Sequence, residues 1–299
     1  MANVTATQKT YTLNTGAKIP AVGLGTWKSS ADEGKAAVEA ALAAGYRHID
    51  TAAAYGNERD VGAGIKASGV PRDQVWLTTK LNNPDHKRVA EALDESLARL
   101  QTDYVDLYLM HWPSSLDPNN PGAVYDDWDY VDTWREMQKA LASGKARAIG
   151  VSNFGVKQLE RLLADKGTTI VPAVDQIELH PANPSPRLVA YLKEKGIHAS
   201  AYSPLGSSSS PFGSNAALKS IAEAKGKAPQ QVLLKWGLHH DFSVLPKSVS
   251  KARIESNFAG LDGWDLGEDD VKALDGIKDR YKACGDGWLP NTVFYDDDE

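Results

Sequence analysis

The chain repeats one pattern eight times: a short apolar run is followed by a segment with helical periodicity. The apolar runs cover residues 22–24, 47–50, 75–80, 105–111, 147–151, 174–177, 197–201 and 243–245, and the helical segments cover 33–44, 58–67, 89–100, 128–142, 156–164, 187–195, 216–224 and 251–258. Short apolar runs that are each followed by a helix are typical of a parallel sheet covered on its outer face. Eight such units predict an α/β fold closed into a (β/α)8 TIM barrel, because an open doubly wound sheet usually has fewer strands.

The two ends of the chain predict additions to the barrel. Residues 11–13 and 17–20 flank the turn Asn14-Thr15-Gly16, which is typical of a β-hairpin outside the main sheet. The segment around Trp288 predicts a C-terminal substrate loop. A length of 299 residues suits one α/β barrel, and no linker divides the chain, although residues 207–210 form a low-complexity loop. We therefore expect a single barrel domain over residues 1–299.

Composition excludes several classes of protein. The net charge of −6 argues against nucleic-acid binding, which concentrates Lys and Arg. No stretch approaches the roughly 18 consecutive apolar residues of a membrane span, and the N-terminus has no secretory pattern. The single cysteine, Cys284, excludes an intramolecular disulfide and is read as a buried or inert thiol, with a reactive thiol as the alternative. We expect a cytoplasmic monomer with no metal site, and an acidic end at 296–299 that is either a solvated terminus or an interaction tail.

Polar residues stand where the predicted strands end. Asp50, Lys80 and His111 end the second, third and fourth strands, and Tyr55 follows Asp50 closely. Active sites of such barrels lie at the carboxyl ends of the strands, so we expect these four side chains to meet. Taken singly, each has an ordinary structural explanation as an ion-paired strand end, a packing residue or a core histidine. Their conjunction favours catalysis.

The chemistry of these four residues suits carbonyl reduction. A phenol has a pKa of about 10. A Lys80 ammonium held by Asp50 is expected to lower the pKa of Tyr55 and make it a usable general acid. A neutral His111 can donate one hydrogen bond to a carbonyl oxygen. The set therefore predicts hydride attack on carbon while Tyr55 delivers a proton to oxygen.

Five motifs, in one order along the chain, give this set a family resemblance. They are GYRHIDTA at 45–52 with YGNE at 55–58, LMHWP at 109–113, IGVSNF at 149–154, and LPKS at 245–248 with Arg253 and Asn257. They resemble the motifs of the aldo-keto reductases, and the resemblance covers almost the whole chain. It implies a barrel whose N-terminal end is closed by the hairpin, NADPH extended across the opposite end, and a catalytic role for Asp50, Tyr55, Lys80 and His111.

The resemblance also assigns an NADP(H) site. Ser152, Asn153 and Gln176 would hold the nicotinamide carboxamide, and Tyr202 would stack on its ring. The remaining candidates for cofactor binding are Thr26, Trp27, Ser203, Leu205, Ser207, Lys247, Ser248, Arg253 and Asn257. Among these, the two cations with Ser248 suit a 2′-phosphate better than a bare ribose hydroxyl; the alternative is that they merely begin a solvated helix. Relatives often carry an acidic residue just before Asn257, where this chain has Ser256.

One short glycine motif does not predict a dinucleotide fingerprint. Gly23-Leu24-Gly25 lacks the third glycine, because Lys28 occupies its place. We expect its glycines instead to allow close backbone approach in the loop after the first strand.

The expected substrate pocket combines aromatic and polar side chains. Its candidates are Trp27, Tyr55, Asn82, His111, Trp112 and Trp288, of which Trp288 could alternatively pack on the barrel rim. Asn82 replaces an aromatic residue that many relatives carry, which favours hydroxylated substrates. We therefore expect reduction of glyceraldehyde-like, sugar or aromatic aldehydes, or the reverse oxidation of a polyol such as glycerol, as in fungal glycerol dehydrogenase or aldehyde reductase members of the family. The alternatives are a non-catalytic NADPH-binding barrel and steroid double-bond reduction; His111 disfavours the second, since those relatives carry Glu there.

Overall fold

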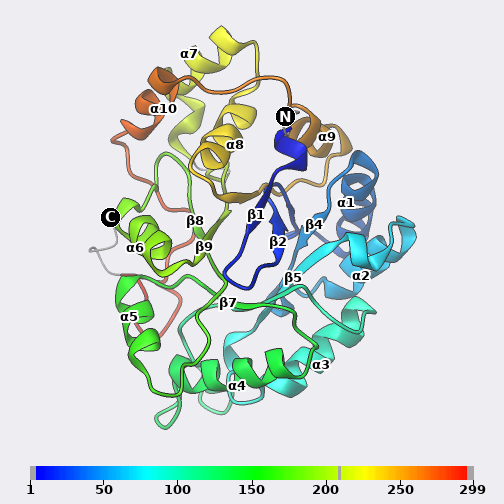
Figure 1. The fold of residues 1–299 in the computed structure, drawn as a ribbon, viewed down its shortest axis with the longest axis vertical. Coiled ribbons are helices and arrows are strands. Elements are labelled where there is room, and N and C mark those ends of the chain that lie inside the picture. The colour runs from blue at the N-terminus through cyan, green and yellow to red at the C-terminus, as the bar shows by residue number, and fades with distance from the viewer. Residues whose placement is uncertain (1–4, 208–209, 295–299) are drawn as a thin grey trace.

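The computed structural model describes residues 5–207 and 210–294; the acidic end at 296–299 lies outside this part, as does the middle of the 207–210 loop. In the described residues, a sheet of eight parallel strands runs in chain order, with helices around it (Figure 1). The strands are β3 (Leu24–Gly25), β4 (His48–Asp50), β5 (Trp76–Leu81), β6 (Leu107–Met110), β7 (Ile149–Ser152), β8 (Val174–Glu178), β9 (His198–Tyr202) and β10 (Ser243–Leu245). The predicted (β/α)8 barrel is confirmed.

The sheet closes where its first and last strands meet. Gly23 N–H donates to Val244 O at 2.9 Å, and Gly25 N–H donates to Pro246 O at 3.1 Å. A Cβ atom on Gly23 would lie 2.7 Å from the side chain of Leu245, so only glycine allows this approach. The expectation of close approach is confirmed, but its location is corrected. Gly23 precedes β3 and Gly25 lies within it, so neither belongs to the loop that follows.

The predicted hairpin closes the N-terminal end of the barrel. Strands β1 (Thr10–Thr12) and β2 (Lys18–Pro20) pair antiparallel around a turn in which Gly16 has a φ of 83°. Leu13 and Ile19 of this hairpin are buried in an apolar cluster with barrel residues at or near the starts of β6, β7 and β8, namely Leu107, Leu109, Ala148, Ala173 and Val174. The hairpin is therefore an apolar plug under the barrel.

Eight helices follow the strands as predicted, with small shifts at their ends. They are α1 (Ala31–Ala44), α2 (Glu58–Ala67), α3 (Val89–Leu100), α4 (Tyr130–Ala142), α5 (Val156–Ala164), α6 (Pro186–Lys195), α7 (Ala216–Lys225) and α9 (Lys251–Ala259). In α3, for example, Val89, Leu93, Leu97 and Leu100 recur at helical spacing and are all buried. Short 3₁₀ helices cover Ala6–Gln8, Ala53–Tyr55, Arg72–Gln74, Asn83–Asp85 and Pro211–Gly213.

Two further helices, α8 (Pro229–His239) and α10 (Glu268–Asp275), were not predicted. The N-terminal end of each helix has a hydrogen bond that helps the helix begin, although neither helix is part of the strand–helix repeat. Gln231 accepts a hydrogen bond from the Ala228 N–H at 3.0 Å, and Asp270 accepts one from the Gly267 N–H at 2.8 Å. In each case the side chain at the third helical position accepts from the backbone N–H of the residue before the helix, which is one half of a capping box. None of the helices in the described ranges combines the length and the apolar character that a bilayer crossing requires.

Candidate functional site

A buried ion pair forms the base of the site. Lys80 on β5 has a side chain with no exposed surface, and its Nζ donates to Asp50 Oδ1 at 2.6 Å and to the Thr51 carbonyl at 2.9 Å. Asp50 is the last residue of the neighbouring strand β4. Burying either charge alone would be strongly destabilising, so the two residues require each other.

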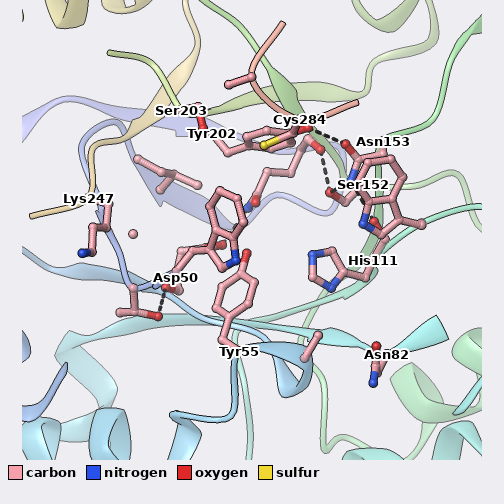
Figure 2. A pocket seen from close by; sticks show the side chains of 18 of the residues that line it. Asp50, Tyr55, Asn82, His111, Ser152, Asn153, Tyr202, Ser203, Lys247 and Cys284 are labelled. Atoms are coloured by element: carbon pink, nitrogen blue, oxygen red, sulfur yellow. Dashed lines mark hydrogen bonds between the residues drawn. The ribbon is translucent and has the colours of Figure 1, made fainter. Parts of the chain in front are cut away.

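Tyr55 and His111 stand above this pair. Tyr55 ends the 3₁₀ helix Ala53–Tyr55, which follows β4, and its hydroxyl lies 3.4 Å from Lys80 Nζ. The Tyr55 and His111 rings meet edge to face with centroids 5.6 Å apart. Asp50, Tyr55 and His111 line a pocket of about 510 Å³ (Figure 2), whereas Lys80 lies behind its lining. The structure thus brings the four predicted catalytic residues together at the carboxyl ends of the strands.

The electrostatics of Tyr55 correct one sequence-based expectation. Burial, followed by the Asp50 carboxylate, raises the pKa of Tyr55 well above its ordinary value of 10.0. Lys80 does not reverse this shift, because Asp50 offsets its charge at 2.6 Å. Burial also lowers the pKa of Lys80 itself. The predicted lowering of the Tyr55 pKa is therefore wrong. Tyr55 is a protonated phenol at neutral pH, which is the form that can donate a proton.

His111 carries no charge at neutral pH. Burial lowers its pKa well below 6.5, and the nearby Lys80 and His86 lower it further. This agrees with the expected neutral imidazole. The His111 carbonyl accepts a hydrogen bond from Asn153 Nδ2 at 2.9 Å, which ties the residue to the neighbouring strand end.

The candidates for the nicotinamide end form one hydrogen-bonded wall (Figure 2). Tyr202 donates to Asn153 Oδ1 at 2.7 Å, Ser152 donates to the Gln176 carbonyl at 2.7 Å, and Gln176 Nε2 donates to Asp50 Oδ2 at 2.7 Å. Gln176 lies in the middle of β8, which ends at Glu178, one residue beyond the predicted apolar run. Both oxygens of Asp50 are therefore engaged, one by Lys80 and one by this wall.

The basic candidates lie at the other end of the pocket, beside the start of α9. Lys247 lines the pocket, and its Nζ donates to the Lys28 carbonyl at 3.2 Å. Arg253 is exposed in the first turn of α9. Neither cation forms an ion pair with a carboxylate in the described part of the chain. The start of a helix beside two cations suits an anion such as a phosphate.

The remaining cofactor candidates divide between the pocket and its surroundings. Thr26 and Ser203 line the pocket, and Thr26 Oγ1 donates to the Asp50 carbonyl at 2.9 Å. Ser256, the departure from the family pattern, accepts hydrogen bonds from Gln231 Nε2 on both its carbonyl and its hydroxyl oxygen, at 3.1 and 3.2 Å. It is therefore engaged with α8. The candidates outside the pocket lining are Leu205, Ser207, Ser248, Arg253 and Asn257.

The predicted substrate residues all line the pocket. Trp27, Asn82, Trp112 and Trp288 border it together with Tyr55 and His111. Trp288 is 59% exposed and meets the Trp112 ring edge to face, with centroids 5.5 Å apart. It therefore lines the pocket and packs on its rim at once, so both readings of this residue apply.

Sequence reasoning missed part of this lining. Ala54, Asn83, Ala283, Cys284 and Gly285 also border the pocket. Cys284 is half-buried in the wall, and burial raises its pKa to about 11, which keeps it a thiol at neutral pH. Nearness to Trp288 was the only sequence signal for this segment. Among the residues that the structure describes, no group of three His, Cys, Asp or Glu side chains is placed to hold a metal ion.

Comparisons of the sequence and of the structure with known proteins find similar proteins. The model of the Aldo/keto reductase family matches residues 21–279. The chain is 41% identical to glycerol 2-dehydrogenase (NADP(+)) of Saccharomyces cerevisiae, over 96% of this chain and 97% of that protein. It is 45% identical to D-galacturonate reductase of Hypocrea jecorina, over 92% of each. The structure of aldose reductase from Schistosoma japonicum superposes with a TM-score of 0.87 at 34% identity, over 94% of this chain and 96% of that one.

Proposed function

We propose that this chain, which belongs to the aldo/keto reductase family, reduces aldehydes with NADPH in the pocket above Asp50 and Lys80. One observation carries the proposal: the Tyr55 hydroxyl stands 3.4 Å from the buried Lys80 Nζ and faces the same pocket as a neutral His111. A protonated phenol and a neutral imidazole side by side are suited to a carbonyl oxygen that gains a proton. NADPH, when bound, supplies the hydride for the carbonyl carbon.

The four residues act in distinct ways. His111 donates a hydrogen bond to the substrate oxygen and orients the carbonyl. Tyr55 gives its proton to that oxygen as charge develops there. Because Lys80 Nζ is already within 3.4 Å, it stabilises the phenolate as the proton leaves. Asp50 keeps Lys80 in place and charged within a site that would otherwise favour the neutral amine.

The residues present fit an NADP cofactor. Tyr202 supplies an aromatic face beside the Ser152, Asn153 and Gln176 wall, and the pocket continues from that wall to Lys247. Lys247 and Arg253, neither of which forms an ion pair in the described ranges, would hold the 2′-phosphate with Ser248. This set favours NADPH over NADH.

The substrate is an aldehyde that carries hydroxyl groups. Asn82 borders the pocket, and its Oδ1 accepts a hydrogen bond from the Asn83 N–H at 3.0 Å. This amide adds polar character to the pocket, whereas Trp27, Trp112 and Trp288 add apolar surface. The names of the relatives, glycerol 2-dehydrogenase and D-galacturonate reductase, point the same way. Glyceraldehyde, sugar aldehydes and aromatic aldehydes all fit, and so does the reverse oxidation of glycerol.

The protein works as a cytoplasmic monomer, with all 299 residues in one barrel domain. In support, the four predicted catalytic residues meet at the strand ends of this one barrel. A non-catalytic barrel is disfavoured for the same reason, since such a role would not require the buried Asp50 and Lys80 pair. Light scattering on the purified protein should return the mass of one chain.

The direct test is a panel of carbonyl compounds with both cofactors. Glyceraldehyde, galacturonate, an aromatic aldehyde and a simple ketone would be assayed by NADPH and NADH oxidation. The expected order is aldehydes above the ketone and NADPH above NADH in kcat/KM. An enzyme that binds NADPH but turns over none of these carbonyls would refute the proposal.

A further inference from the structure

Glu178 is a buried carboxylate to which the chemistry above gives no role. It is the last residue of β8 and is 2% exposed. Its Oε1 accepts from the backbone N–H of Ala283 at 2.6 Å and lies 2.9 Å from His180 Nε2, while its Oε2 accepts from the Cys284 N–H at 2.8 Å. Hydrogen bonds to a buried carboxylate are among the strong ones in proteins. Glu178 therefore joins the barrel to a segment more than one hundred residues away in sequence.

That segment is one wall of the substrate pocket. Residues 283–285 and Trp288 line the pocket and belong to no helix or strand. Figure 2 shows Cys284 on the same side of the pocket as Tyr202 and Ser203. The strand register also pairs Glu178 with Tyr202, the residue expected to stack on the nicotinamide. Glu178 thus lies where the cofactor wall and the substrate wall join.

The segment is held at a second point beyond Trp288. Gln158 Nε2 on α5 donates to the Val293 carbonyl at 2.6 Å, and Asp286 Oδ2 accepts from the Val293 N–H at 2.8 Å. Between the two points, Trp288 packs on Trp112. The chain therefore spans from Glu178 to Gln158 as a strap, defined here as residues 283–293.

We propose that Glu178 is a positioning residue that holds this strap against the barrel, and that it thereby sets the selectivity for bulky aldehydes. The inference rests on the proposed function for its substrate class, but the hydrogen bonds it concerns are independent of catalysis. With the strap in place, Trp288 stands over the pocket as a preformed apolar surface. A bulky ring gains from that surface, whereas a three-carbon aldehyde held by Tyr55 and His111 gains little.

The isosteric change Glu178→Gln tests the contact itself. Glutamine offers one carbonyl oxygen where two are in use, and its NH₂ group would face a backbone N–H that needs an acceptor. Hydrogen exchange of residues 281–294, measured by mass spectrometry on the intact protein, should become about tenfold faster, as expected for losing roughly one charge-assisted hydrogen bond. Unchanged exchange in this segment would overturn the proposal. If E178Q does not fold, Glu178→Asp keeps the charge but is too short for both amides, and the same result is expected.

A matched control separates the strap from general destabilisation. Glu58 is equally buried and accepts from Thr79 Oγ1 and Arg99 Nε, far in sequence from the strap. Glu58→Gln should leave the exchange of residues 281–294 unchanged. Equal acceleration in both variants would mean that Glu178 has only a structural role.

Kinetics then test the claim about selectivity. In E178Q the KM for an aromatic aldehyde should rise about tenfold, while kcat and NADPH affinity stay within about twofold and glyceraldehyde is little affected. In the double variant with Trp288→Ala the two effects on KM should not add, because both act through the same wall. The claim that Glu178 sets selectivity would be overturned if E178Q changed the KM for both aldehydes equally. It would also be overturned if the effects of E178Q and Trp288→Ala on KM were additive. The exchange experiment needs no substrate, so failure of the proposed function would be seen separately, as absent turnover in the unmodified enzyme.

Discussion

The two ends of the barrel are built from opposite materials. At the N-terminal end, Leu13 and Ile19 of the hairpin fill an apolar cluster. At the carboxyl end, the strands finish in buried charges and hydrogen-bonding groups, with Asp50 held by Lys80 on one oxygen and by Gln176 on the other. The first end gains stability from apolar burial, whereas the second keeps groups whose burial opposes folding unless each is paired. Because all eight strands run in the same direction, the apolar contacts that stabilise the fold lie at one end of the barrel, and the proposed catalytic residues lie at the other.

The largest expected effect comes from removing one oxygen at the carboxyl end. Tyr55→Phe should lower kcat for aldehyde reduction by about 100- to 10,000-fold, because it deletes the general acid. NADPH binding and the thermal midpoint should change little, since among the described residues the Tyr55 hydroxyl has one hydrogen-bonding partner, Lys80 Nζ, at the long distance of 3.4 Å. Stopped-flow reduction and fluorescence titration with NADPH measure the two quantities. Loss of NADPH binding in the variant would contradict the role assigned to Tyr55.

A substitution at the N-terminal end of the barrel should have the opposite result: it should lower stability and leave activity unchanged. Ile19→Ala removes a side chain with no exposed surface from the hairpin plug and should lower the free energy of unfolding by about 2–5 kcal/mol. Because Ile19 lies at the opposite end from the pocket, kcat/KM measured well below the new thermal midpoint should stay unchanged. Urea unfolding and the aldehyde assay, run on the same sample, check both statements. A parallel fall in kcat/KM would break the proposed separation.

Acid should act first on buried histidines. Burial lowers the pKa of His48 to about 4 and that of His86 to about 3. His48 Nδ1 lies 3.2 Å from the Pro20 carbonyl of the hairpin. Since unfolding restores a value near 6.5, the unfolded chain binds more protons, so stability rises with pH between about 4 and 6.5 and falls as acid is added. The loss by pH 5 should be of the order of 2 kcal/mol for each histidine. His48→Gln should reduce the pH slope of the unfolding free energy, and an unchanged slope would show that His48 is not responsible.

The smallest expected effect concerns the cofactor. Lys247→Ala should weaken NADPH binding by about tenfold, as expected for losing one charge-assisted contact, and NADH binding by much less. Isothermal titration with each cofactor would measure the two losses of affinity. Added salt should make the loss for NADPH smaller, because Lys247 is exposed and its charge is screened. Equal losses for both cofactors would remove Lys247 from the 2′-phosphate site.

The barrel could be predicted from the sequence because each strand–helix unit has a pattern that can be recognised in a short stretch of residues. Asp50, Lys80 and His111 could be placed together from their positions at or beside successive strand ends alone. Helices α8 and α10 escaped because each adds a helix where the strand–helix alternation had already been satisfied. The raised pKa of Tyr55 escaped because it depends on burial, which no spacing reports. The same holds for the contact of Glu178 with residues 283 and 284, which joins distant segments without any repeating pattern.

The most direct test of the separation between the two ends is a crossed measurement on Tyr55→Phe and Ile19→Ala. For both variants and the unmodified protein, the unfolding free energy and the kcat for NADPH-dependent reduction of glyceraldehyde would be determined under one set of conditions. We predict that Tyr55→Phe loses turnover and keeps stability, while Ile19→Ala loses stability and keeps turnover. If Ile19→Ala lost turnover as severely as Tyr55→Phe, or if Tyr55→Phe retained full turnover, the assignment of chemistry to the carboxyl end of the barrel would be contradicted.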